Sequence, residues 1–213
     1  MPRLILSNIH ETPDFQIGLW NVSEDEETLI LEFPELNRFR SKVDGIKSKS
    51  KRLEYLVERI LLKDMLGTIP EVFHEKSGKP FIQEKRHISI SHTRGYVAVM
   101  LSDSFNVAID MEYPSERVCR VAEKFLRNDE KADTPFDQLV CWCSKETLYK
   151  LHSSDNLSFH EMRVTGIPLG SVRLNEGCLY IENVRRSKKI LVRYMATPSY
   201  ILTYAMEKDT EIL

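Results

Sequence analysis

The chain has 213 residues, and the 42% that are hydrophobic are enough for a core in one large domain or two small ones. Its formal net charge is −2, from 30 basic and 32 acidic residues, which argues against a general electrostatic affinity for nucleic acid or anionic membranes. No stretch is apolar over the length that a membrane-spanning helix needs, and the N-terminal apolar run is too short for a signal peptide. We therefore expect a cytoplasmic protein, and we interpret its four cysteines as reduced packing residues because none of them forms a C-x-x-C pair.

The N-terminal part of the sequence combines short strands with one long helix. Ser23 is followed three positions later by Glu26, a capping-box pattern that predicts the start of a helix. Residues 38–52 are basic and polar, which fits either a solvated loop or a surface that steers an acidic partner. In chain order we predict strands at 4–6 and 15–20, helices at about 23–31 and 51–66, a turn at 75–80, and strands at 87–91 and 96–101.

The C-terminal part also groups its helices and strands in blocks, and this order predicts an α+β fold with mainly antiparallel sheets. The chain divides near residue 105 into two halves, 1–105 and 106–213, and each half contains a long helix and a group of strands. Sequence similarity between the halves is too weak to prove a repeat. In chain order we predict a strand at 106–112, an amphipathic helix at 115–130, a helix at about 136–151, and strands at 162–167, 171–175, 178–184, 190–196 and 200–206.

The strand in the sequence NVAIDMEYP carries two carboxylates. Asp110 and Glu112 are two residues apart, so in an extended strand they point to the same face, about 7 Å apart. Like charges at this distance repel each other unless a cation lies between them. The simpler reading of an isolated pair is one residue in solvent and one cap near Pro114. If a cation is bound, both carboxylates should face a cleft, and Met111 should face the core.

The helix around Trp142 has an unusual polar face. An ordinary solvated face with a Glu146–Lys150 pair is one explanation, although an exposed indole needs a surface to cover. At about 100° per residue, Val140, Ser144, Leu148 and Leu151 share one side, and Trp142, Lys145, Glu146, Tyr149 and Lys150 share the opposite side.

A third candidate region is the sequence SISHTRG, which runs from a strand through Ser91 and His92 into a turn at Gly95. A hydroxyl, an imidazole and turn amides together suit a phosphate group. On its own, this region is more simply read as a structural hydrogen bond at the end of a strand.

Taken together, the three regions predict a site for magnesium and phosphate. Asp110, Glu112 and Glu146 supply the oxygen ligands that Mg²⁺ prefers, and no cluster of cysteine and histidine competes for zinc. The sequence contains neither a G-x-x-x-x-G-K-[ST] loop nor a G-x-G-x-x-G motif. The candidate phosphate contacts are Arg52, Lys79, His92, Lys145 and Lys150.

At these residues the sequence resembles the 4′-phosphopantetheinyl transferases, specifically the long, single-chain type that modifies carrier domains of biosynthetic synthases. The two signature motifs of that family, G-I-D-x-E and W-x-x-K-E-x-x-x-K, correspond to AIDME at 108–112 and WCSKETLYK at 142–150. Ala108 replaces the usual glycine and Thr147 replaces a common alanine, and neither is a metal ligand. The likeness extends from about residue 15 to 165. It includes KRLEYLVERILL (51–62), GKP (78–80), ISISH (88–92) and FLRNDE (125–130), in the order of the family.

The resemblance implies two similar halves related by pseudo-twofold symmetry, with coenzyme A bound in the cleft between them. It also implies the reaction, in which phosphopantetheine moves from coenzyme A to a serine of an apo acyl or peptidyl carrier protein and adenosine 3′,5′-bisphosphate leaves. We expect the site to be complete in one chain and the protein to be a monomer that binds neither nucleic acid nor a membrane.

The resemblance further implies roles for individual residues. Glu146, or a metal-bound water under its control, is the candidate base for the serine proton. Asp110, Glu112 and Glu146 would hold Mg²⁺ on the pyrophosphate, Lys145 and Lys150 would neutralise the departing phosphate, and Arg52, Lys79, Ser91 and His92 would contact the nucleotide end with its 3′-phosphate.

Two other functions stay open from the sequence. A Mg²⁺-dependent phosphoesterase or nucleotidyl transferase would use the same carboxylates on small phosphoesters. A non-catalytic paralogue would bind coenzyme A or a carrier without transfer, although the presence of every candidate ligand and both helix lysines counts against it. The sequence does not specify the carrier, the pathway or whether Mn²⁺ replaces Mg²⁺.

Overall fold

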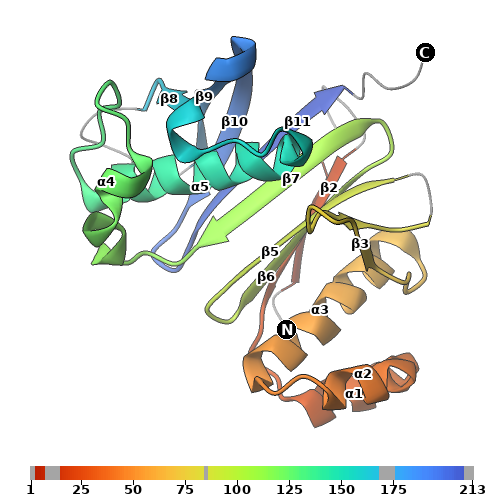
Figure 1. The fold of residues 1–213 in the computed structure, drawn as a ribbon. Coiled ribbons are helices and arrows are strands. Elements are labelled where there is room, and N and C mark those ends of the chain that lie inside the picture. Colours follow the sequence, from red (N-terminus) through yellow and green to blue (C-terminus); the bar gives the residue numbers. More distant parts are fainter. Residues whose placement is uncertain (1–2, 8–14, 84–85, 168–175, 209–213) are drawn as a thin grey trace.

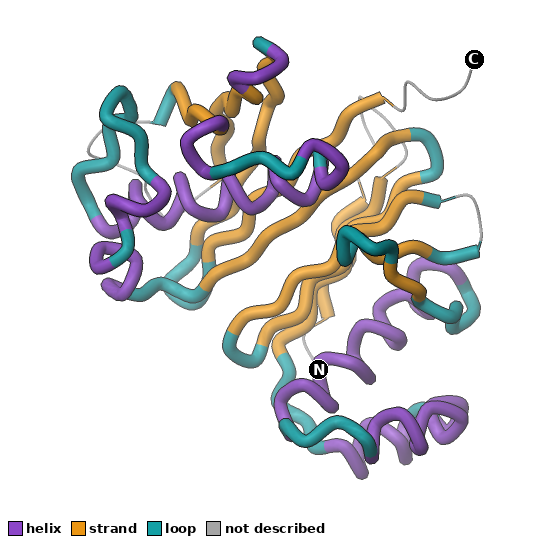
Figure 2. Tube along the Cα trace, in the orientation of Figure 1, coloured by secondary structure: helices purple, strands orange, loops and turns teal. Residues whose placement is uncertain are grey.

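The computed structural model describes residues 3–7, 15–83, 86–167 and 176–208. It contains two larger antiparallel sheets, and the strands occupy the middle of the molecule while the helices lie on its outer sides (Figures 1 and 2). The predicted mixed α+β class with antiparallel sheets is confirmed. Among the described residues, no helix has the length and apolar character needed to cross a membrane.

The first sheet has the strand order β1-β2-β6-β5, and the long helix α3 packs on its outer face. Leu56 and Ile60 of α3 are fully buried because apolar residues recur at helical spacing on this side of the helix. The Ser48 side chain caps the start of α3, and Gly67 ends it in the left-handed conformation with φ of 80°. The elements are β1 (Arg3–Ser7), β2 (Phe15–Asn21), α1 (Glu26–Glu32), η1 (Pro34–Phe39), α2 (Arg40–Asp44), α3 (Lys49–Leu66), the small hairpin β3 (Phe73–His74) and β4 (Pro80–Phe81), β5 (His87–Thr93) and β6 (Tyr96–Ser102).

The second sheet has the order β7-β11-β10-β9-β8, and the helix α5 crosses its outer face. A capping box fixes the start of α5, since Thr134 and Asp137 exchange side-chain and backbone hydrogen bonds there. The elements are β7 (Phe105–Glu112), η2 (Glu116–Arg120), α4 (Ala122–Phe125), α5 (Pro135–Leu151), η3 (Ser153–Asp155), η4 (Phe159–Glu161), β8 (Met162–Thr165), β9 (Glu176–Asn183), η5 (Val184–Arg186), β10 (Lys188–Ala196) and β11 (Ile201–Lys208).

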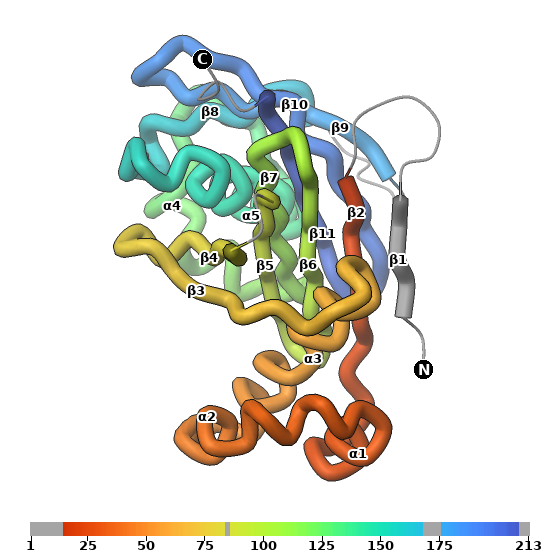
Figure 3. Tube along the Cα trace, turned by 90° about the vertical axis from the view of Figure 1, so that its right-hand side faces the viewer, coloured from red at the N-terminus to blue at the C-terminus, as the bar shows by residue number. Residues whose placement is uncertain are grey.

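The two sheets meet through an apolar layer and along the edges of β5 and β7 (Figure 3). At these edges, side-chain hydroxyls of β5 accept hydrogen bonds from two backbone amides of β7 and from that of Tyr113, the residue after β7. We call this set of three bonds the hydroxyl ladder. Because the partners keep a constant separation of 20 residues, β5 and β7 run in the same direction. The bonds run from Ile109 N to Ser89 Oγ (3.0 Å), from Met111 N to Ser91 Oγ (3.1 Å) and from Tyr113 N to Thr93 Oγ1 (3.0 Å).

Two predictions in the N-terminal part differ from the structure. The cap of α1 is Asp25 and not Ser23, because the Asp25 carboxylate accepts the Thr28 amide at 2.8 Å. The basic stretch 38–52 is mostly helical and contains the end of η1, all of α2 and the start of α3.

The predicted helix at 115–130 is also wrong, because the structure divides it into η2, α4 and a turn. The physical reason is Glu130, whose side chain turns into the interior and accepts the amides of Arg127 (2.8 Å) and Val164 (2.6 Å). A continuous helix would carry this carboxylate away from both amides. The strand predicted at 171–175 lies outside the described residues.

Candidate active site

The strand β7 places the two motif carboxylates on the side of α5. Asp110 is 6% exposed and Glu112 is partly buried, while Met111 between them is buried in the apolar layer between the sheets. The alternation of the strand therefore directs Met111 to the core, as predicted.

The Asp110 carboxylate is held through one of its two oxygens. Oδ1 accepts hydrogen bonds from Ser91 Oγ at 3.1 Å and from Lys150 Nζ at 2.8 Å. Oδ2 is buried as well, but no nitrogen or oxygen donor bonds to it. A buried carboxylate oxygen without such a donor is unfavourable unless a cation or another ligand can approach it.

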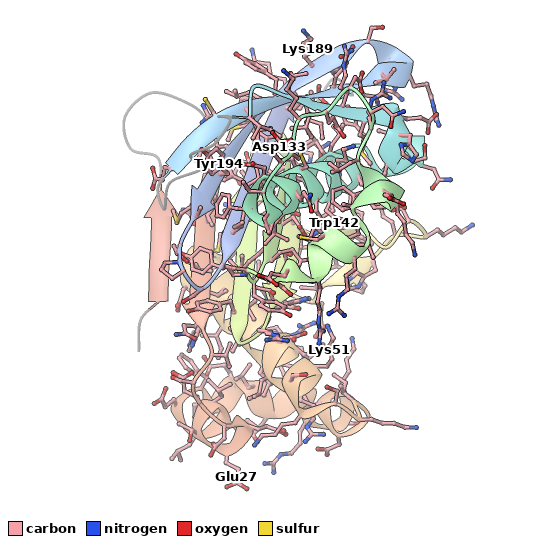
Figure 4. All side chains as sticks on the ribbon, turned by 90° about the vertical axis from the view of Figure 1, so that its left-hand side faces the viewer. Glu27, Lys51, Asp133, Trp142, Lys189 and Tyr194 are labelled. Atoms are coloured by element: carbon pink, nitrogen blue, oxygen red, sulfur yellow. The ribbon has the colours of Figure 1, made fainter. Side chains whose placement is uncertain are left out.

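Glu112 points toward α5, where Trp142 Nε1 donates a hydrogen bond to its Oε1 at 3.2 Å. Trp142 is not an exposed indole, because its ring packs against Phe125 and Phe159 at centroid distances of 5.2 and 5.1 Å, and these two rings also contact each other. In Figure 4, Trp142 lies near the middle of the molecule. Burial and the neighbouring Asp110 raise the pKa of Glu112 above its ordinary value.

Glu146 of α5 completes the group of acidic side chains. Burial, together with the charges of Asp110 and Glu112, raises the pKa of Glu146 to about 7, although Lys150 opposes the shift. The repulsion felt by Glu146 comes from both β7 carboxylates, so the strand motif and the helix motif contribute to one electrostatic site. With a single lysine beside three carboxylates, this site has an excess of negative charge.

Lys150 connects the carboxylates to a cavity of about 220 Å³ beside α5, which we call the α5 cavity. Its ammonium group also donates to the carbonyl of Ile109 at 2.9 Å. Glu146 and Lys150 line one side of the α5 cavity, and Lys79 lines it from the separate β3–β4 hairpin of the N-terminal half. A phosphorylated ligand in this cavity would meet cationic groups from both parts of the chain.

Lys79 also lines a neighbouring polar cavity of about 400 Å³. Its ammonium group donates to Asn106 Oδ1 at 2.7 Å, at the junction of the two cavities. Of the four residues predicted to contact the nucleotide end, only Lys79 lines the α5 cavity.

Lys145 lies elsewhere, and our prediction that it contacts phosphate does not fit its placement. It is fully buried, and its ammonium group donates to Phe125 O (2.6 Å), Phe159 O (3.2 Å) and Glu130 Oε2 (2.7 Å). The helical projection placed Lys145 on the side of Glu146, but α5 is buried around most of its circumference, so this lysine faces a separate polar pocket under α4 and η4.

The other predicted nucleotide contacts also have partners within the protein. Arg52 donates to Glu26 Oε2 at 2.8 Å and to Ile46 O at 2.9 Å, which fastens α3 to the preceding segments. His92 Nε2 lies 2.5 Å from Glu58 Oε1 on α3. Ser91 belongs to the hydroxyl ladder and to Asp110. None of these three lines the α5 cavity.

The carboxylates as placed do not form a finished metal site. Among the described residues, no three aspartate, glutamate, histidine or cysteine side chains are close enough to hold a metal ion together. The chemistry nevertheless fits a hard cation, because Asp110 has an oxygen without a nitrogen or oxygen donor, and both glutamates have raised pKa values from burial and like charge. For one metal ion to bind Asp110, Glu112 and Glu146 together, the side chains of the two glutamates would have to rotate.

Sequence reasoning missed one further neighbour of the site, Cys143. Its thiol is fully buried on α5, and burial followed by the charge of Asp110 raises its pKa well above the usual value. Helical spacing from Glu146, three residues later, was the available signal. The two exposed cysteines, Cys119 and Cys178, contradict the expectation that all four pack in the interior.

No protein-family model matches this chain, and no curated protein is detectably similar to it in sequence. The resemblance to a known family therefore depends on the motifs and on the site in which their residues lie.

Proposed function

We propose that this protein is a Mg²⁺-dependent 4′-phosphopantetheinyl transferase. It moves the phosphopantetheine group from coenzyme A to a serine of an apo acyl or peptidyl carrier protein and releases adenosine 3′,5′-bisphosphate. The observation that carries the proposal is the electrostatic coupling of Asp110 and Glu112 to Glu146, beside the α5 cavity that Lys150 and Lys79 line.

The proposal includes the arrangement of the chain. The halves 1–105 and 106–213 would be related by a pseudo-twofold axis, with coenzyme A between them. The presence of one antiparallel sheet and one long outer helix in each half supports this relation. Since the candidate residues come from one chain, we propose a monomer, located in the cytoplasm.

In the proposed reaction, the serine oxygen forms a bond to the β-phosphorus of coenzyme A, and the bond from that phosphorus to the bridging oxygen breaks. Lys150 and Lys79 bind the phosphates and neutralise charge on the departing group. Asp110, Glu112 and Glu146 would hold the Mg²⁺, which when bound stabilises negative charge on the phosphate oxygens.

The serine proton requires an acceptor. Glu146, or a water that it holds, is the candidate acceptor. Burial raises the pKa of Glu146 to about 7 in the metal-free protein, and a bound Mg²⁺ would lower it, so a water held by Glu146 fits this role better than a carboxylate on the metal. We assign Lys150 to phosphate binding and not to proton transfer, because its side chain donates to Asp110 Oδ1 and to the carbonyl of Ile109.

The test is to incubate the protein with coenzyme A, Mg²⁺ and several apo carrier proteins, and to weigh the carriers by intact mass spectrometry. We expect a gain of one phosphopantetheine group, lost in Asp110→Ala and Glu146→Ala and retained in Glu123→Ala, an exposed glutamate of α4. Coenzyme A binding without a gain in mass on any carrier would contradict transfer and favour a binding protein. Hydrolysis of small phosphoesters without carrier modification would favour a phosphoesterase.

A further inference from the structure

The Asp110 carboxylate belongs to the second sheet, but one of its donors comes from the first sheet. That donor is Ser91 of β5, which is 5% exposed. Its Oγ lies 3.1 Å from Asp110 Oδ1 and 3.1 Å from Met111 N. A serine hydroxyl has one hydrogen to donate, so the amide of Met111 uses a lone pair and the hydrogen is directed to the carboxylate.

The hydroxyl ladder provides an internal comparison for this serine. Ser89 accepts the amide of Ile109, and Thr93 accepts the amide of Tyr113, in the same geometry. Among the described contacts, neither of these two hydroxyls reaches a carboxylate, whereas Ser91 does. The ladder alone therefore explains the bond to Met111 but does not explain the bond to Asp110.

The bond from Ser91 has a consequence for Oδ2 of Asp110, which has no nitrogen or oxygen donor, although the weak thiol donor of Cys143 also forms a hydrogen bond with this carboxylate. Ser91 and Lys150 both donate to Oδ1, and together they fix the plane of the carboxylate. The remaining oxygen, Oδ2, is left buried and without a nitrogen or oxygen donor. A carboxylate that can rotate would share its donors between both oxygens, so the two donors on one oxygen keep the other available.

We propose that Ser91 is a positioning residue, which orients the Asp110 carboxylate across the sheet interface so that Oδ2 is presented to a divalent cation. Ser91 does not contact the substrate in this role. The inference rests on the proposed function in one respect, namely that the cation is the Mg²⁺ of the transferase site. Groups that orient a metal ligand typically change metal affinity about 10- to 100-fold when they are removed.

The experiment compares Ser91→Ala with Ser89→Ala. Each change removes one buried hydroxyl of the ladder and leaves one backbone amide without its acceptor, so both should destabilise the fold. Urea unfolding should therefore show similar losses for both variants. Binding of Mn²⁺, measured by electron paramagnetic resonance of the free ion, should separate them. The measurement is made without coenzyme A, because Ser89 also lines the α5 cavity.

We expect Ser91→Ala to weaken Mn²⁺ binding about 10- to 100-fold and Ser89→Ala to change it less than about twofold. Ser91→Thr should restore most of the affinity, because Thr93 shows that a threonine hydroxyl can occupy a ladder position. If Ser91→Ala does not fold, Ser91→Cys replaces it, since the thiol has nearly the same size but is a weak donor. Equal Mn²⁺ affinities in the Ser91 and Ser89 variants, or no Mn²⁺ binding by the unmodified protein, would overturn the inference.

The outcome is separable from that of the proposed function. If Mn²⁺ binds and depends on Ser91, but no carrier protein gains mass, the positioning role stands and the transferase assignment fails. If carriers are modified while the Ser91 and Ser89 variants bind Mn²⁺ equally, the assignment stands and the positioning role fails.

Discussion

The helix α5 carries two lysines that pair with carboxylates, and their surroundings differ in one decisive respect. Lys145 and Glu130 are fully buried and satisfied, since the lysine has three acceptors and both glutamate oxygens accept amides or the ammonium group. Lys150 and Asp110 also form a close pair, but one oxygen of the aspartate has no nitrogen or oxygen donor. The first pair stabilises a fold, and the second leaves capacity for a ligand.

The pKa shifts around the two lysines also distinguish the satisfied pair from the pair with an unpaired carboxylate oxygen. Burial lowers the pKa of Lys145, and the hydrogen bond that it donates to Glu130 only partly offsets this shift. The region of Lys150 has the opposite imbalance, because burial and like charge raise the pKa values of Glu112 and Glu146. This surplus of carboxylates, more than the ion pair itself, is why we propose a cation site beside Lys150.

The largest effect should come from breaking the satisfied pair. Lys145→Met leaves the Glu130 side chain without its cationic partner in the interior, and we expect a loss of about 3–5 kcal/mol in the free energy of unfolding. Urea denaturation followed by circular dichroism measures it. Glu130→Gln should cost less, because an amide oxygen can still accept one of the two backbone amides. A loss below about 1 kcal/mol for Lys145→Met would contradict the structural role assigned here.

The second pair should show the reverse profile, with function lost and the fold retained. Lys150→Met removes a cation from the α5 cavity, and we expect carrier modification to slow about 10²- to 10³-fold. Its unfolding free energy should change less than that of Lys145→Met, because the Lys150 side chain is 29% exposed whereas that of Lys145 has no exposed surface. Lys189→Met, at an exposed lysine of β10, serves as the control for loss of a positive charge. Equal rates of carrier modification by Lys150→Met and Lys189→Met would show that Lys150 has no role in the active site.

A smaller effect is expected from the surplus of negative charge itself. An unfolded glutamate loses its proton near pH 4.5, whereas Glu146 in the folded protein loses it near pH 7, so the folded state holds an extra proton between these values. The stability linked to this proton is present below about pH 4.5 and is lost as the pH rises through 7.

Glu146→Gln should therefore stabilise the metal-free protein at pH 8 and not at pH 4.5. After allowance for solvent screening, we expect a gain on the order of 1–2 kcal/mol. Thermal unfolding in the presence of a chelator at both pH values measures it. A gain of equal size at both would show that the charge of Glu146 is not the cause.

The smallest effect should come from an exposed pair, Glu161 with Arg185. The Arg185 guanidinium and the Ser158 amide lower the pKa of Glu161 to about 2, so any contribution is present above its ordinary pKa and is lost as the pH falls through 2. Because solvent screens this pair, Glu161→Gln should leave the midpoint of urea unfolding at pH 7 nearly unchanged. If Glu161→Gln shifted the midpoint of urea unfolding nearly as much as Lys145→Met, burial would not explain the difference between the Lys145–Glu130 and Arg185–Glu161 pairs.

The sequence predicted the features that depend on local periodicity. The alternation of AIDME directs Met111 to the core, and the apolar spacing of the long helices locates α3 and α5 to within a few residues. Features that depend on partners distant in the chain could not be predicted. Lys145 faces inward only because Glu130 turns into the same pocket, and Ser91 contacts Asp110 only because β5 and β7 lie beside each other.

The hydroxyl ladder also makes the opening of the molecule observable. The amides of Ile109, Met111 and Tyr113 donate to side chains of β5 and not to a carbonyl of their own sheet. Exchange of these three amide hydrogens with deuterium therefore requires the two sheets to separate, but it does not require either sheet to unfold. Their exchange rates, compared with those of neighbouring amides of β7, would measure how often the two sheets separate in the native protein.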